Sequence, residues 1–558
     1  MNGATGLLSR RVDAIRMMDG AQSKRLANIA HIVTLAVAAG WILFTSRRQW
    51  FFGDEWAFFI NRREQWAAGH EIDAVMLPHN EHWTALPAVL FFAMFKLFGL
   101  HSYLLYLLPV VAAHLAAAFS LRLILIRIGV GNWASALFVT PFAFFGAGAE
   151  NLTWAFQIAF VGAVSFGLVL LLLVSNKSAT LRRDLLAITA GVGALMCSGM
   201  GIPFVVAAAV VLVIDRSWLR LIRVVAPIAV IFGLWYLIWG SDSSSGLPPA
   251  SLKVVPRFVW TGSTATLEGL TQLRGIGAVI LVGCVVVLCL KPPQHALVLG
   301  CAAGAASMFV LTALGRAGLG QEQATASRYT YIAGALLLPV VVAALRTATA
   351  TQPRAWLVAV VFTSWAAVGN AADMSSFTQA RYDVVNGGRR RIEAAASLRD
   401  LALIDPNAVP DPTYNPNLTA GALRALVESG KLDVPDELPT QDVLSAAAAL
   451  LVHVGPVAAP PETSRGDVTT SAPLDYENCV FGTGAGVTLN VRDAVTLQIQ
   501  GWVGAIVQIA ALTPSGEQGP IMAFAIQDAI TPIEIYSTEF PILLVLPEAV
   551  RLCGIVVA

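Results

Sequence analysis

Two adjacent carboxylates, Asp54 and Glu55, stand inside the aromatic run FFGDEWAFF at residues 51–59, shortly after the first strongly apolar segment of the chain. A carboxylate close to hydrocarbon is costly unless it is wetted, paired or used chemically. A positioned carboxylate can draw a proton from a hydroxyl group, and such bases contribute about 10² to 10⁴ in rate. The pair is therefore the first candidate for general-base chemistry.

Three further polar segments interrupt the apolar sequence: LPHNEHW, GAENLTWAFQ and LGRAGLGQEQATASRYTY. Their candidate substrate-binding side chains are His79, Glu81, His82, Glu150, Asn151, Gln157, Arg316, Arg328 and Tyr329. Carboxylates and imidazoles can relay protons, and arginines on a face where basic residues are rare indicate an anionic partner. The alternatives are ordinary ones: wetted interface residues, helix-packing amides, and arginines paired with Glu322 or with lipid headgroups.

The composition indicates a polytopic membrane protein. Of the 558 residues, 56% are hydrophobic and only 13% are charged, and the mean hydropathy is +0.68. A soluble domain has about 25% charged residues. The net charge is +1, and no basic cluster with interleaved aromatic residues occurs, which excludes nucleic acid as a partner. The first apolar run lacks a small-residue cleavage site after it, so we expect a transmembrane helix with a cytoplasmic N-terminus.

Eleven segments are apolar enough to be expected to cross a membrane. They lie near residues 27–45, 102–126, 133–149, 154–174, 183–199, 200–214, 221–240, 275–290, 294–314, 329–346 and 354–370. Connections rich in Lys and Arg alternate with connections that are poor in them, and this places the basic ones in the cytoplasm. The polar segments described above and the chain after residue 370 are then extracytoplasmic.

The segment ALPAVLFFAMFKLFG, residues 85–99, is barely long enough to cross. Counting it as a crossing would invert every basic connection that follows. We therefore expect a juxtamembrane helix at the outer leaflet.

The pattern of apolar and polar residues changes after residue 370. An amphipathic helix is expected in RRRIEAAASLRDLALIDPN, and a Pro-rich linker is expected around residues 455–473. The alternating segments VTLNV, AVTLQIQG, AIVQIAAL and PILLVL then predict an antiparallel β-sandwich. The expected parts are a cytoplasmic segment 1–26, a helical membrane module 27–370 with a catalytic external loop 46–101, a helical and linker region 371–473, and a β-domain 474–558.

The chain has six cysteines, and they fall into two classes. Four lie in apolar spans and are expected to be packing residues: Cys197, Cys284, Cys289 and Cys301. Cys479 and Cys553 bracket the β-rich region, and an exported domain lies in a compartment that permits disulfides. A disulfide between these two cysteines is therefore predicted, with Cα atoms within about 7 Å of each other.

The arrangement resembles the GT-C superfamily of membrane glycosyltransferases, which includes protein O-mannosyltransferases, aminoarabinose transferases and actinobacterial arabinosyltransferases. The similarity covers residues 27–370, with GDEW at the family position of an acidic pair and NEHW, ENLTWAFQ and SRYTY as further motifs. It implies a polyprenyl-phosphate sugar donor, a catalytic carboxylate and basic residues that hold the donor phosphate. The family's Pro-Pro-Leu signature is replaced by HWTALPAV, so the resemblance does not name the sugar.

The chemistry fits these positions. Nucleotide sugars are absent outside the cytoplasm, so a transferase acting there needs a sugar on a lipid phosphate. An inverting transfer needs one base for the acceptor hydroxyl and positive charge at the departing phosphate. Asp54 is the expected base and Glu55 its support, while Arg328, helped by Arg316, is the expected phosphate clamp. The expected acceptor is a cell-envelope glycan, lipid or protein, and the enzyme is expected to be an integral protein of the plasma (inner) membrane.

Three alternatives stay open. His79, Glu81 and His82 could bind a divalent cation with Asp54 or Glu55, although their spacing matches no common zinc signature. A transporter or flippase of lipid-linked saccharide could line its pathway with the same residues, although no internal repeat is visible. A non-catalytic envelope assembly protein could bind glycan through the β-domain.

Overall fold

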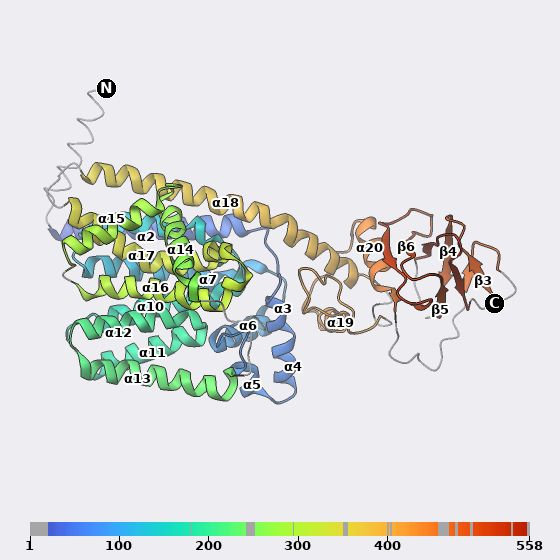
Figure 1. Cartoon of the computed structure of the whole chain (residues 1–558), viewed down its shortest axis with the longest axis horizontal. Helices are drawn as coiled ribbons and strands as arrows, with labels where there is room; N and C mark the ends of the chain where they lie inside the picture. Colours follow the sequence, from blue (N-terminus) through green and yellow to red (C-terminus); the bar gives the residue numbers. More distant parts are fainter. Residues whose placement is uncertain are drawn as a thin grey trace, which may run out of the picture. The chain divides into compact units, whose positions relative to one another are not determined.

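The computed structural model describes residues 20–178, 180–241, 252–293, 295–349, 355–398, 401, 404–455, 468–474, 478–491, 495–536 and 540–554 (Figure 1). The chain divides into two compact units. The first contains Met1–Gln49, Gln65–Ala93 and Tyr103–Tyr382, and the second contains Trp50–Glu64, Met94–Ser102 and Asp383–Ala558. The acidic pair thus belongs to the unit that also holds the C-terminal part of the chain.

The first unit is helical, and its longer helices pack side by side (Figure 1). It contains α2 (Gly20–Ser46), α5 (Glu71–Met76), α7 (Tyr103–Arg127), α8 (Asn132–Ala143), α9 (Ala149–Thr153), α10 (Ile158–Val174), α11 (Leu181–Cys197), α12 (Ile202–Ile214), α13 (Trp218–Trp235), α14 (Val255–Thr271), α15 (Gly277–Leu290), α16 (Ala296–Arg316) and α17 (Ser327–Thr349). Its main helix pairs are α12 with α16, α10 with α11 and with α7, and α16 with α17. Three helices have residues in both units: α4 (Asn61–Ala67), α6 (Ala85–Phe98) and α18 (Ala355–Ala396).

Within the described residues, seven helices are long and apolar enough to cross a membrane. They are Gly20–Ser46, Tyr103–Arg127, Ala155–Val174, Trp218–Gly240, Ala296–Leu319, Ser327–Thr349 and Leu357–Ser397, and each matches one of the eleven expected crossings. The other four expected crossings are shorter helices, α8, α11, α12 and α15, so the number of crossings stays a prediction. The segment expected at residues 85–99 is the apolar helix α6. The chain is an integral membrane protein with a mostly helical fold.

Two helical features differ from the expectation. Helix α14 was not anticipated, because Thr, Ser and Glu residues lower its hydropathy while Phe258, Leu267 and Leu270 are buried on one face. It packs against α15, α16 and α17. The crossing expected at 354–370 and the first part of the separate amphipathic helix expected after it belong to one continuous helix, α18, which ends at Ala396. No proline interrupts this stretch, so nothing in the sequence forces the helix to end.

The second unit contains α3 (Glu55–Phe59), α19 (Ala420–Glu428), α20 (Thr440–Leu450) and two five-stranded antiparallel sheets. One sheet has the order β1-β8-β5-β10-β3, with β1 (Val452–Val454), β8 (Ile530–Ile535), β5 (Val495–Gln500), β10 (Arg551–Cys553) and β3 (Cys479–Phe481). The other has the order β2-β4-β9-β6-β7, with β2 (Val468–Thr470), β4 (Gly486–Val491), β9 (Ile542–Val545), β6 (Ile506–Ala511) and β7 (Met522–Ala525).

The four strands predicted from alternating hydrophobicity are β4, β5, β6 and β9, and alternate residues of each are buried. The C-terminal β-sheet domain begins earlier than the expected residue 474, because β1 and β2 precede it. Each of these two strands has only three residues, too few to show an alternating pattern. Most of the expected linker, residues 456–467, lies outside the described residues.

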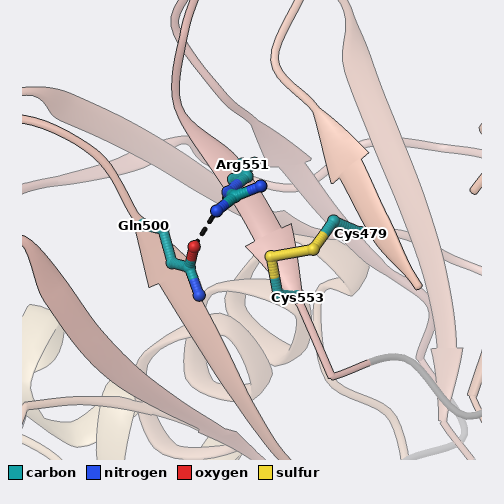
Figure 2. Close-up of a disulfide and its surroundings, with 4 residues drawn as sticks. All are labelled: Cys479, Gln500, Arg551 and Cys553. Carbon is teal, nitrogen blue, oxygen red and sulfur yellow. Dashed lines mark hydrogen bonds between the residues drawn. A yellow bond between two sulfur atoms is a disulfide. The ribbon is translucent and has the colours of Figure 1, made fainter. Parts of the chain in front are cut away.

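A disulfide joins Cys479 to Cys553, the pair that the sequence predicts (Figure 2). The two cysteines face each other across the antiparallel strands β3 and β10, with Cα atoms 4.0 Å apart. On the other side of β10, Arg551 Nε donates a hydrogen bond to Gln500 Oε1 of β5 at 2.8 Å. The disulfide therefore joins residues 74 positions apart and closes a loop that contains most of both sheets.

The disulfide should stabilise the β-sheet domain. Replacing Cys479 and Cys553 by Ser in the full chain should lower the free energy of unfolding of this domain by about 2 to 5 kcal/mol, because the closed loop restricts the unfolded chain. Protease protection of residues 468–554 against denaturant concentration measures this. Cys289→Ser, which changes an exposed free cysteine of α15, is the control. Equal protection of all three proteins would contradict the prediction.

Candidate functional site

The acidic pair lies on a sharp turn that leads into α3. Gly53 has a φ of 62°, a left-handed conformation that favours glycine. Asp54 follows as the residue that precedes α3, and its side chain makes no capping hydrogen bond to that helix. It is half-buried, whereas Glu55 is 0% exposed. The turn thus separates the two carboxylates into one that solvent can reach and one that it cannot.

Glu55 is held by the turn itself. Its Oε2 accepts a hydrogen bond from the main-chain N of Phe52 at 2.8 Å. On both sides of it in the sequence, Trp50, Phe51, Trp56 and Phe59 form an aromatic cluster with ring centroids 5.5 to 6.3 Å apart. A carboxylate in such surroundings is stable only when it is hydrogen-bonded. The main chain therefore fixes the position of Glu55.

Asn415 is far from the turn in sequence but lies in the same unit, and its side chain forms hydrogen bonds with the turn. Its Oδ1 accepts hydrogen bonds from the main-chain N of Gly53 at 3.1 Å and from the indole Nε1 of Trp56 at 2.8 Å. Its Nδ2 donates to Asp411 Oδ2 at 2.6 Å. Arg391 of α18 contacts Asp411 in turn. Its Nε donates a hydrogen bond to Asp411 Oδ1 at 3.1 Å, and its Nη2 forms an ion pair with the same oxygen at 3.0 Å. This chain of contacts, from Arg391 through Asp411 and Asn415 to the turn, is called the turn anchor below.

The turn anchor requires the side chains of Asp411 and Asn415 to pack closely against the main chain of α18. A Cβ atom at Gly388 would lie 2.8 Å from Asn415 Nδ2 and 3.0 Å from Asp411 Oδ2. Both side chains are almost fully buried. No sequence motif marks this anchor, because Asp411 and Asn415 sit in the Pro-rich stretch DPNAVPDPTYNPN, which has the composition of a connecting segment. Their role follows from a contact between residues more than 350 positions apart.

In the first unit, Glu81 pairs with Arg316. The Arg316 NH2 group donates to Glu81 Oε2 at 2.6 Å, so the structure joins two candidate residues from distant segments. His79 and His82 flank Glu81 in a small antiparallel bridge, with main-chain hydrogen bonds of 3.0 Å in both directions. The ring of His79 packs edge-on against Phe156, and the ring of His82 packs edge-on against Phe160.

A second acid–base pair lies on α9 and α17. Glu150 Oε1 is 3.9 Å from Arg328 NH1, and the main-chain N of Glu150 donates to Ser327 Oγ at 3.1 Å. The Arg328 guanidinium also lies 5.5 Å from the ring centroid of Tyr329. The carboxylate partners of the two arginines are thus Glu81 and Glu150, and Glu322 is exposed.

The remaining predicted residues are buried. Asn151 is 0% exposed, and both polar atoms of its amide lack a hydrogen-bond partner within the described part of the chain. Gln157 and Tyr329 are also buried. The sequence did not indicate one nearby cation, Arg381 of α18. Its guanidinium lies 4.9 Å from the ring centroid of Trp154, and Trp154 is close to Asn151 in sequence. A buried amide without a partner is uncommon and fits a site that binds a polar group.

The residues considered for a divalent cation do not form a ligand set. Glu81 is engaged by Arg316, and the two histidine rings are packed on phenylalanines. Across the described ranges, no group of three or more His, Cys, Asp or Glu side chains is placed to hold a metal ion.

Comparisons with known proteins give a structural likeness but no sequence match. No family model matches the chain, and no curated protein matches it. It is similar to crystal structures of ArnT from Cupriavidus metallidurans, one bound to undecaprenyl phosphate and one in the apo state. Each has 15% sequence identity and a TM-score of 0.46, and the matches cover 67% of this chain and 81% and 80% of those chains. A likeness at this level assigns the chain to no family.

His82 should make the first unit less stable in acid. The pKa of His82 is lowered from 6.5 to about 4, mainly because the side chain is buried. The Glu81 carboxylate acts in the opposite direction and raises this pKa, whereas the Arg316 guanidinium lowers it. The unfolded chain binds a proton at this side chain below pH 6.5, but the folded chain binds it only near pH 4. Stability should therefore be unaffected above pH 6.5 and should fall as the pH decreases from about 6.5 to about 4.

Thermal unfolding of the full chain between pH 7.5 and 4.5 measures this effect. His82→Asn should reduce the loss of melting temperature in the acid range, because the substituted side chain does not titrate. His70→Asn is the matched control, since His70 is exposed on the same connecting segment and makes no capping hydrogen bond. The same acid dependence in the wild-type and His82→Asn proteins would show that His82 does not control it.

Proposed function

We propose that this chain is a membrane glycosyltransferase that moves a sugar from a polyprenyl-phosphate-linked donor to a hydroxyl group of a cell-envelope glycan, lipid or protein. The observation that carries the proposal is the turn of residues 52–56. It presents the half-buried carboxylate of Asp54 beside a buried, hydrogen-bonded Glu55, and the turn anchor fixes it. An accessible carboxylate on a turn whose main chain is held in place is suited to act as a general base.

The reaction is an inverting displacement. The acceptor hydroxyl oxygen attacks the anomeric carbon as the bond from that carbon to the phosphate oxygen breaks. Asp54 takes the proton of the acceptor hydroxyl, and the polyprenyl phosphate leaves with the bonding electron pair. Glu55 does not exchange protons in this scheme, because its carboxylate is enclosed and bonded to the Phe52 main chain. It keeps Asp54 in place.

The departing phosphate needs positive charge or hydrogen-bond donors. Arg328 is the best candidate, since it is partly exposed and its contact with Glu150 is long at 3.9 Å. Arg316 is more firmly held, at 2.6 Å from Glu81, and supports the same anionic end of the donor. The unsatisfied amide of Asn151, next to Glu150, adds a donor and an acceptor for a polar group of the substrate.

The direction of insertion is part of the proposal. Arg127, Lys177 and Arg216 lie where α7, α10 and α12 end, and they line cavities at one end of the first unit. The Glu81–Arg316 and Glu150–Arg328 pairs lie at the other ends of α16 and α17. Basic residues mark the cytoplasmic side, so the acid–base pairs face outward. Nucleotide sugars are not available there, which favours a lipid-linked donor.

The direct test incubates the purified full chain with a panel of polyprenyl-phosphate sugars and cell-envelope acceptors. Transfer of a sugar to an acceptor, detected by mass spectrometry, is the expected result. Movement of the intact lipid-linked saccharide across a vesicle membrane without transfer would instead identify a transporter. Glycan binding with no transfer from any donor would identify an assembly protein.

Substitutions at the proposed base and at the phosphate clamp should have different effects. Asp54→Asn keeps the size of the side chain but removes the proton acceptor, so turnover should fall by about 10² or more while donor affinity is retained. Glu55→Gln should be milder, because the amide oxygen can still accept the Phe52 hydrogen bond. Arg328→Ala should weaken both donor binding and turnover, since the phosphate is charged in the ground state and in the transition state.

Steady-state kinetics with a defined donor separates these effects. Glu64→Gln, an exposed carboxylate on α4, is the control and should have wild-type activity. Near-normal transfer by Asp54→Asn would mean that Asp54 is not the base, and Glu81 and Glu150 would then be tested.

The turn anchor should act through its hydrogen-bond pattern. Asn415→Asp places a second carboxylate 2.6 Å from Asp411 and should lower turnover by about tenfold to a hundredfold. Adding Asp411→Asn restores one donor and one acceptor at that contact, so the double variant should recover most of the turnover. Gln500→Ala, which removes the Arg551 contact in the same unit, is the control. Turnover in the double variant as low as in Asn415→Asp would refute a positioning role for the anchor.

A further inference from the structure

Two adjoining cavities open where α10 and α12 end and α13 begins. Their volumes are about 670 and 620 Å³, and Asn176, Lys177 and Asp215 line both of them. Helices α10 to α13 that surround this region pack side by side (Figure 1). The two cavities together are called the basic pocket below, because Lys177, Arg216 and Arg223 line the first cavity and Arg127 lines the second.

The wall of the pocket is rigid because of Arg220. Its Nε donates to Asp184 Oδ1 of α11 at 2.7 Å. Its terminal nitrogens donate to the main-chain oxygens of Leu173, Val174 and Asn176 at 2.7 to 2.8 Å. Arg220 therefore neutralises Asp184 and caps the end of α10, and four of its five N–H donors are used within the protein.

The remaining charges of the first cavity do not balance. Apart from Arg220, its lining has three cationic side chains, Lys177, Arg216 and Arg223, and one carboxylate, Asp215. Lys177, Arg216 and Asp215 are exposed, and Arg223 makes only a 3.9 Å contact with Asp184, which is already paired with Arg220. Cations gathered around a cavity of this volume favour an anionic ligand.

The position of the pocket fits the level of lipid headgroups. It is placed at the ends of apolar helices, and α13, which begins beside it, belongs to the crossing that is least buried within the protein. Trp218, Leu219 and Ile222 on the first turns of α13 are 57 to 64% exposed. A tryptophan at a helix end is typical of the membrane interface. An anion in the pocket would thus have an apolar surface next to it along which acyl chains can lie.

We propose that the basic pocket binds the phosphate headgroup of an anionic phospholipid. The phosphate lies among Lys177, Arg216 and Arg223, and the acyl chains pack along α13 through Trp218 and Ile222. The second cavity, with Arg127 and the shared Lys177, accommodates a second phosphate, so a lipid with two linked phosphates binds more tightly than one with a single phosphate. This site is independent of the proposed glycosyl transfer.

Native mass spectrometry of the full chain, titrated with phosphatidylglycerol, diphosphatidylglycerol and phosphatidylcholine, tests the proposal. Both anionic lipids should bind more tightly than phosphatidylcholine. The triple variant Lys177→Ala/Arg216→Ala/Arg223→Ala should lose on the order of 10² in affinity for phosphatidylglycerol, about fivefold for each cation, and nothing for phosphatidylcholine. Asp215→Asn should act in the opposite direction and tighten anionic-lipid binding about fivefold.

The matched control is Lys24→Ala/Arg182→Ala/Lys291→Ala, which removes three exposed cations that do not line the pocket. Equal losses in both triple variants would show only a general charge effect and would overturn the proposal. So would unchanged lipid affinity in the first triple variant. A competition arm with inorganic phosphate distinguishes the source of the anion, since complete displacement of phosphatidylglycerol by phosphate at millimolar concentration would identify a free-anion site.

Discussion

Much of this structure depends on the cost of removing a carboxylate from water. An unpaired buried charge is not tolerated, and a buried carboxylate needs donors in good geometry. At residues 52–56 the donor to Glu55 is the main chain itself, while the neighbouring main-chain N and the Trp56 indole are satisfied by Asn415. The turn can therefore sit in an aromatic cluster with one acid enclosed and the other, Asp54, left accessible. A single hydrogen-bond pattern thereby gives two adjacent carboxylates different environments.

The same constraint acts differently on the ion pairs of the helical unit. The Asp184–Arg220 pair is enclosed, and the remaining donors of Arg220 are used on main-chain oxygens. This pair holds helix ends together, and its buried charges do not exchange partners. Glu150 and Arg328 are partly exposed, and their charged groups lie 3.9 Å apart. Such a pair loses little when the arginine changes partner. Burial thus distinguishes the pair that holds the fold from the pair that is proposed to bind a substrate.

Local patterns predicted much of the fold. Apolar length identified the long helices, and period-two alternation identified β4, β5, β6 and β9. The disulfide followed from two cysteines that bracket that region. Patterns failed where tertiary contacts decide the structure: α14 hides a buried face among Thr and Ser, and α18 continues past the point where its hydropathy falls. The candidate site follows the same division, since Asp54 and Glu55 are proposed from residue type and placement, whereas the contacts of Asn415 and Asp411 with the turn are visible only in the structure.

The helical unit carries different chemistry at its two ends, and α16 connects them. Its first residues, Ala296 and Leu297, line the basic pocket, and its last residue, Arg316, binds Glu81. A helix of 21 residues is about 30 Å long, which is the thickness of the hydrocarbon core. Cations that a lipid headgroup can neutralise therefore lie one membrane thickness away from the acid–base pairs. In the proposed arrangement, anionic lipid holds one end of the bundle without competing for the arginines at the other end, where a lipid-linked phosphate is proposed to bind.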